Sequence, residues 1–165
     1  MTQSSHSTPC LVFGCGNPLF GDDGFGPEVI EHLQEHHEIP EHVLCLDAGT
    51  GIRDALFDIL LSEEKPRQII IIDAAEHDGK LPGDIFEIDV DNIDPKKTSD
   101  FSLHQFPTTN MLKELKDLTN VDVRVLVVQI AHIPEEINPG LSGPVMAAVP
   151  NMCQRVMRII NKETA

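Results

Sequence analysis

Two adjacent carboxylates in a glycine-rich turn are the first residues of this sequence that could do chemistry. The turn reads Gly-Cys-Gly-Asn-Pro-Leu-Phe-Gly-Asp-Asp-Gly-Phe-Gly over residues 14–26, with the acidic pair at Asp22 and Asp23. It follows an apolar run and leads into a helical pattern, so it joins a strand to a helix. A phosphate-binding turn presents bare backbone N–H groups and often a lysine, whereas two carboxylates repel an anion. The turn therefore suits a cation, a basic group or acid–base chemistry.

Two further residues could join Asp23 at one edge of a sheet. Asp73 follows the apolar run at residues 68–72, and His104 lies before a predicted helix. Open α/β sheets bind ligands at the carboxyl ends of their strands, and a crossing loop could bring the histidine there. Two carboxylates and one imidazole would form an open site for a borderline divalent ion. The residues alone leave alternatives open, since acidic residues at strand ends also cap helices or face water.

Other polar residues near this edge have structural interpretations as well. We interpret Asp22 as accepting backbone N–H bonds within the turn or capping the helix, in preference to ligating an ion. Asp47 and Thr50 follow the second strand, where they could bind a peptide or cap a turn. His132 follows the last strand and is expected to be a solvated loop residue, with a place in a substrate groove as the alternative. Surface exposure is expected for the histidines of the first helix, which no HExxH pattern joins: His32, His36 and His37.

The order of the predicted elements indicates a single α/β domain over residues 1–165, with residues 1–9 as a flexible N-terminal tail. Strands are predicted at residues 11–13, 43–46, 68–72, 85–90 and 123–129, and helices at 27–37, 54–61, 111–118 and from Ser142 onward. This alternation predicts a three-layer sandwich in which helices flank both faces of a mainly parallel, roughly five-stranded twisted sheet.

Particular strands and loops can be placed within this sandwich. The run at residues 68–72 is apolar after its first residue and predicts a central strand, whereas residues 85–90 alternate with acids and predict an edge. Residues 95–100 are expected to form an exposed loop that could act as a mobile flap. Pro150 is expected to kink the last helix or to delay its regular part.

Composition excludes several classes of function. A formal net charge of −15 argues against nucleic acid as a partner, because phosphate binding needs basic patches. The sequence has no apolar run long enough for a membrane span, and residues 1–9 are polar and lack the charged and apolar regions expected of a signal peptide. Its four scattered cysteines favour reduced thiols, as expected for a cytoplasmic protein. A monomer is the default expectation. The sequence also lacks a GxSxG elbow, a cysteine-protease signature and an HExxH motif, so peptide cleavage would require carboxylates and a metal.

The turn at residues 14–26 resembles the opening motif of the hydrogenase maturation proteases. Four more blocks follow in that family's order: Asp-Ala-Gly-Thr at 47–50, Ile-Ile-Ile-Asp-Ala at 70–74, Ser-Leu-His-Gln at 102–105 and Pro-Glu-x-x-x-Pro-Gly-Leu-Ser at 134–142. Each block alone is weak evidence, whereas five in order over most of the chain make the resemblance specific.

The resemblance implies an endopeptidase that removes the C-terminal extension from the large-subunit precursor of a nickel–iron hydrogenase. The family's metal ligands correspond to Asp23, Asp73 and His104, which would also form the catalytic site. Nickel in the precursor would be the recognition element, shared transiently, and Zn or Cd could replace it in vitro. Some members carry Glu where this chain has Asp23, a difference that should shift the ligand geometry by one methylene. The family is grouped with aspartic-type peptidases, and a coenzyme F420-reducing hydrogenase is a possible target.

Two other functions remain as alternatives. A non-catalytic, nickel-binding assembly factor for the large subunit could use the same three ligands without cutting a peptide. A dinucleotide-binding loop is disfavoured, because Leu19 stands where that fingerprint needs its third glycine and the acidic pair opposes a pyrophosphate.

Overall fold

The computed structural model describes residues 9–92, 98–100 and 106–164. The strands are β1 (Cys10–Cys15), β2 (Val43–Gly49), β3 (Gln68–His77), β4 (Ile85–Ile88), β5 (Thr98–Asp100) and β6 (Asp122–Gln129). The helices are α1 (Phe25–His36), α2 (Ile52–Leu61), α3 (Phe106–Leu118) and α4 (Gly143–Thr164), with short 3-10 turns η1 (Gly21–Gly24) and η2 (Val90–Asn92).

Five strands lie side by side in the order β2-β1-β3-β6-β4, and the short β5 pairs with the end of β3. The pairs β1–β2, β1–β3 and β3–β6 are parallel, whereas β4 pairs antiparallel with β6 at the edge. This arrangement confirms the predicted mainly parallel sheet, with β1 and β3 in its interior and β4 at its periphery. Parallel neighbouring strands cannot be joined by a tight hairpin and need long crossover connections, which are usually helices. Such helices are therefore expected on the faces of the sheet.

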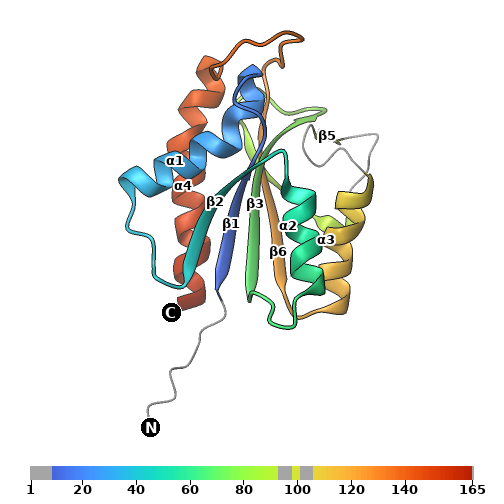
Figure 1. Cartoon of the computed structure of the whole chain (residues 1–165). Helices are drawn as coiled ribbons and strands as arrows, with labels where there is room; N and C mark the ends of the chain where they lie inside the picture. The colour runs from blue at the N-terminus through green and yellow to red at the C-terminus, as the bar shows by residue number, and fades with distance from the viewer. Residues whose placement is uncertain (1–8, 93–97, 101–105, 165) are drawn as a thin grey trace.

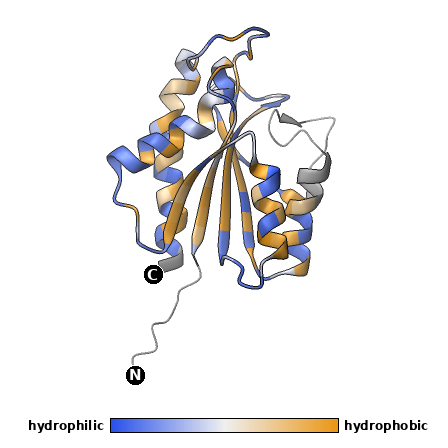
Figure 2. Cartoon of the chain, viewed as in Figure 1, coloured by the Kyte–Doolittle hydropathy of each residue, from blue (hydrophilic) through white to orange (hydrophobic). Residues whose placement is uncertain are grey.

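The helices form one layer on each face of the sheet (Figure 1). Helices α1 and α4 pack together on one face, and α2 and α3 pack together on the other. Successive side chains of β3 point to opposite faces, so Ile70 and Ile72 belong to one core and Ile69 and Ile71 to the other. Figure 2 shows largely apolar strands between helices that carry both apolar and polar residues. Burial on both faces explains the continuous apolar run of β3.

The structure corrects three details of the sequence interpretation. The third strand does not end before Asp73, because β3 continues to His77 and its residues through Ala75 pair with β6. The pairing of β3 with β1 ends at Ile72, so β5 can pair with residues 75–77 from a segment that was predicted as a loop. Pro150 does not delay the last helix, since α4 is continuous from Gly143, and the alternative, a kink, stays a prediction.

The last helix is otherwise as its sequence predicts. Its expected apolar stripe is buried against the sheet, and consists of Val145, Val149, Cys153, Val156 and Ile160. Among the described helices, none combines the length and the apolar character needed to cross a bilayer. The predicted tail falls almost entirely in residues 1–8, outside the described residues.

Candidate active site

The glycine-rich turn sits directly on the carboxyl ends of the two central strands. A Cβ atom added to Gly26 would lie 2.3 Å from the carbonyl oxygen of Cys15 and 2.7 Å from that of Ile72. The same atom on Gly14 would lie 2.4 Å from the carbonyl oxygen of Gly26. Only glycine lets the first turn of α1 approach the ends of β1 and β3 so closely. These glycines therefore hold the preceding acidic pair at the edge where parallel sheets place their ligands.

Asp23 is half-buried in η1, with the turn folded back around it. Its Oδ2 accepts a hydrogen bond from the backbone N–H of Asn17 at 2.9 Å. Gly16 has a φ of +131°, and a Cβ there would lie 1.8 Å from the Asp23 carbonyl oxygen and 3.3 Å from Oδ1. A side chain at residue 16 would thus displace Asp23, which explains the second glycine of the motif.

Asp73 lies in the central strand β3, and its side chain is completely buried. Its Oδ1 accepts the backbone N–H of Ala74 at 2.8 Å. Burying a carboxylate is costly unless hydrogen bonds, an opposite charge or a metal ion compensate for the lost water. The turn η1 packs against β3, so Asp23 and Asp73 come from contacting elements. Asp73 therefore places a fully buried carboxyl group in the central strand that the acidic turn contacts, a position suited to a catalytic or metal-binding side chain.

His104, the third predicted site residue, lies outside the described residues. The joint site of Asp23, Asp73 and His104 therefore stays a prediction. Of the three residues, the structure brings the elements of Asp23 and Asp73 together.

Asp22 has a different role from its neighbour. Its carboxylate is 1% exposed and accepts the N–H groups of Ala131 (2.9 Å), His132 (3.3 Å) and Ser142 (2.7 Å), as well as the Ser142 hydroxyl at 3.0 Å. The interpretation that Asp22 accepts backbone N–H bonds is correct. However, these donors lie in the loop before α4 and not within the turn. Asp22 therefore links that loop to the turn. Ser142 takes part in this link through its N–H and its hydroxyl, a role that the sequence did not reveal.

Asp22→Asn is expected to destabilise the protein by about 2 kcal/mol or more, because an amide NH2 would face buried N–H donors. For a chain of this size, that loss lowers the Tm by roughly 4–8 °C. Thermal unfolding followed by circular dichroism measures the effect. Asp23→Asn is the matched control, since its amide oxygen can still accept the Asn17 N–H. Equal Tm values for the two variants would contradict the structural role of Asp22.

The end of β2 borders the same turn. The N–H of Gly16 donates to the carbonyl of Gly49 at 2.9 Å, and Gly49 has a φ of +54° that favours glycine. Asp47 is exposed and its Oδ1 accepts the Gly49 N–H at 2.9 Å, so its side chain caps the strand-to-helix turn. Thr50 and His132 are exposed, and the exposure of His132 agrees with the expected loop position.

The histidines of α1 are not all on the surface. His36 is exposed as expected, but His32 and His37 are half-buried. The prediction was wrong for these two because α1 packs against α4, a neighbour that the helical pattern alone could not supply.

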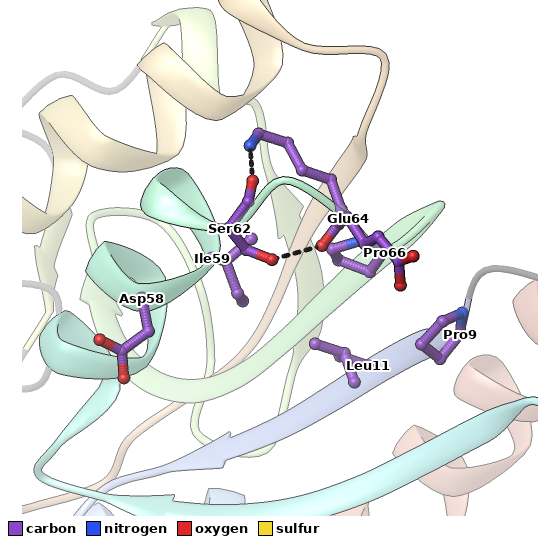
Figure 3. Close-up of a pocket in the computed structure, with 8 residues that line it drawn as sticks. Pro9, Leu11, Asp58, Ile59, Ser62, Glu64 and Pro66 are labelled. Atoms are coloured by element: carbon purple, nitrogen blue, oxygen red, sulfur yellow. Dashed lines mark hydrogen bonds between the residues drawn. The ribbon is translucent and has the colours of Figure 1, made fainter.

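A hollow of about 330 Å³ lies at the opposite, amino end of the sheet (Figure 3). Pro9 and Leu11 from the start of β1 line it, together with Asp58 and Ile59 of α2 and the segment that follows α2. The Ser62 hydroxyl donates to the Glu64 carbonyl at 2.7 Å, so its polar groups stabilise the local turn. The hollow contains neither Asp23 nor Asp73 and does not belong to the candidate site.

Comparisons with known proteins point to one family. The profile of the family described as hydrogenase maturation protease matches residues 27–159. The chain is 37% identical over 155 residues to the coenzyme F420 hydrogenase subunit delta of Methanothermobacter thermautotrophicus, covering 89% of this chain and 91% of that protein. It is 26% identical over 154 residues to the hydrogenase 2 maturation protease of Escherichia coli, covering 92% of this chain and 90% of the relative.

Solved structures agree with the assignment of the fold. The NiFe hydrogenase maturation protease of Thermococcus kodakarensis superposes with a TM-score of 0.73 at 23% identity, over 95% of each chain. The profile match spans most of the sequence, and the curated relatives match over nearly their full length. This chain therefore belongs to the hydrogenase maturation protease family and is a peptidase.

Proposed function

We propose that this protein cuts the C-terminal extension from the nickel-loaded precursor of a nickel–iron hydrogenase large subunit, using Asp23, Asp73 and His104. The observation that carries the proposal is the placement of Asp73, a fully buried carboxylate in the central strand against which the Asp23 turn packs. Family membership supplies the class of reaction, and these carboxylates supply groups that could perform it.

The chain length permits the histidine to join the two carboxylates. Asp100, the last residue of β5, pairs with Ala75, which is two residues after Asp73. His104 follows Asp100 by four residues, and four residues of extended chain span at most about 14 Å. The reach of the chain therefore allows His104 to join Asp73, as the proposal requires.

The proposed chemistry divides the nickel coordination between enzyme and substrate. Two carboxylates and one imidazole are too few to saturate the ion, so other positions remain for ligands of the precursor. The ion would hold the scissile bond beside Asp23 and Asp73. Water then adds to the peptide carbonyl, the C–N bond breaks and the leaving amine takes a proton. Polarisation of the peptide carbonyl by the ion is the preferred version, and a carboxylate acting as general base is the alternative. Zn or Cd could replace nickel in vitro.

The relative from Methanothermobacter favours a particular target. It is named as a subunit of coenzyme F420 hydrogenase, and it matches this chain at 37% identity. We therefore propose the large subunit of a coenzyme F420-reducing hydrogenase as the substrate, processed in the cytoplasm by a monomeric enzyme.

Intact-mass spectrometry of the nickel-loaded precursor tests the proposal. Incubation with the purified protein should lower the precursor mass by that of one C-terminal peptide, and the released peptide should be detected. Precursor incubated alone is the control. A precursor that binds the protein but keeps its mass would favour the alternative, a nickel-binding assembly factor without protease activity.

A further inference from the structure

A cluster of three metal-binding side chains lies between α1 and α4, away from the proposed active site. Within the part of the chain that the structure describes, one group of three His, Cys, Asp or Glu residues has its ligand atoms within 4.8 Å of one another. The group consists of His32 and His37 from α1 and its C-cap, and Cys153 from α4. It lies on the sheet face where these two helices pack together (Figure 1).

The end of α1 explains how two histidines five residues apart can meet. On a regular helix, residues at this spacing point about 140° apart. The helix ends at His36, and His37 has extended backbone angles (φ −130°, ψ 147°) while its N–H still bonds to the carbonyl of Leu33. The two imidazole rings lie with their centroids 6.2 Å apart. Termination of the helix at this residue thus brings both rings to one side.

Cys153 supplies a soft donor from the other helix. Its side chain is fully buried, and its Sγ lies 3.7 Å from the carbonyl oxygen of Val29 in α1. Burial, with a further contribution from the Cys45 thiol, raises the pKa of Cys153 to about 12. The thiol is therefore protonated in the metal-free protein, and an incoming ion must displace that proton.

The donor set and its surroundings favour a borderline divalent ion. Imidazole nitrogen and thiolate sulfur are the common ligands of Zn²⁺, at about 2.0–2.1 Å and 2.3 Å, whereas Mg²⁺ and Ca²⁺ prefer oxygen. Tetrahedral nitrogen and sulfur ligands at these distances lie roughly 3.3–3.6 Å apart, so small side-chain rotations would close the cluster around an ion. The carboxyl end of a helix also attracts positive charge, and His37 caps that end of α1.

We propose that His32, His37 and Cys153 form a second metal site, which binds a borderline divalent ion such as Zn²⁺ with water in the fourth position. The ion would link the end of α1 to α4. His32 is seven residues beyond the start of α1, so it lies about 10 Å further along the helix, whereas Asp23 precedes the helix. The site is thus separate from the proposed active site.

Cobalt titration of the full chain, free of any polyhistidine tag, tests the proposal. A cobalt–thiolate charge-transfer band should rise to one equivalent and disappear when Zn²⁺ is added. Cys153→Ser should abolish the band, since the serine can keep the contact with Val29 but supplies no thiolate. His32→Ala and His37→Ala should weaken cobalt binding at least about tenfold, because even outer partners of metal ligands contribute that much.

Matched controls separate this cluster from the other residues of the same types. Cys10→Ser and His77→Ala should keep the band, since Cys10 bonds to Gln68 and His77 packs against Phe86 in other parts of the fold. Asp73→Asn should also keep it, which distinguishes this site from the active site. Zn²⁺ should raise the Tm of the wild type but not that of His37→Ala. The proposal would be overturned if the wild type lacked the band or if Cys153→Ser retained it. It would also be overturned if Cys45→Ser lost the band while Cys153→Ser did not.

Discussion

Replacing Asp73 with asparagine is expected to leave the protein folded and to lower the rate of precursor cleavage at least about 100-fold. Asparagine has nearly the same shape as aspartate, and its amide oxygen can still accept the N–H of Ala74. The variant removes the negative charge that would ligate the ion or activate water. Single-turnover cleavage of nickel-loaded precursor, followed by mass spectrometry, measures the rate, and circular dichroism checks the fold.

Asp58→Asn is the matched control for this prediction. Asp58 is an exposed aspartate of α2 at the amino end of the sheet, where it lines the hollow of Figure 3. The same chemical change there should leave the cleavage rate within about twofold of the wild type, because surface charges far from a site are largely screened. A wild-type rate for Asp73→Asn would move the catalytic assignment to another residue. A loss of rate in Asp58→Asn would point to the hollow.

The sequence predicts a strand well where burial on one or both faces of the sheet determines which residue types the strand contains. The apolar residues 69–72 identify the central strand. The alternation of apolar and acidic residues over 85–90 identifies an edge, where residues 85–88 form β4. The point where β3 ends was not predictable, because Asp73 interrupts the apolar run while the strand continues through pairing with β6 and β5. That pairing depends on segments distant in the chain. Local patterns therefore locate strands more reliably than they locate strand ends.

The same distinction holds for the candidate site. The glycine spacing and the acidic pair predict a turn at the end of β1, since backbone geometry and charge are local properties. The different roles of Asp22 and Asp23 depend on the loop before α4, whose N–H groups all lie more than 100 residues from Asp22. The approach of Cys153 to His32 likewise depends on helix packing. In both cases the type of residue indicated a possible role, but the side chains and N–H groups that it contacts could be found only from the tertiary structure.

Nickel-loaded precursor is expected to be cleaved at least about 100-fold faster than precursor prepared without nickel, a difference worth about 2.7 kcal/mol of transition-state stabilisation. The reason is the incomplete ligand set proposed for the active site. Asp23, Asp73 and His104 would bind an ion only together with ligands from the precursor, so a precursor without the ion offers nothing to complete the coordination. Nucleotides and added thiol reagents should have no effect on the rate.

The nickel must be loaded before the enzyme is added, with free ion removed, because the cluster of His32, His37 and Cys153 would otherwise compete for it. Both precursors are then compared at equal enzyme concentration. A zinc-loaded precursor serves as a third sample, because it shows whether cleavage requires nickel itself or only a divalent charge. Equal cleavage with and without nickel would contradict the shared-ion mechanism. It would leave a protease in which Asp23 and Asp73 act as a simple acid and base, and Asp73→Asn would still be inactive. The two predictions together therefore distinguish the residues that cut the peptide from the ion that selects the substrate.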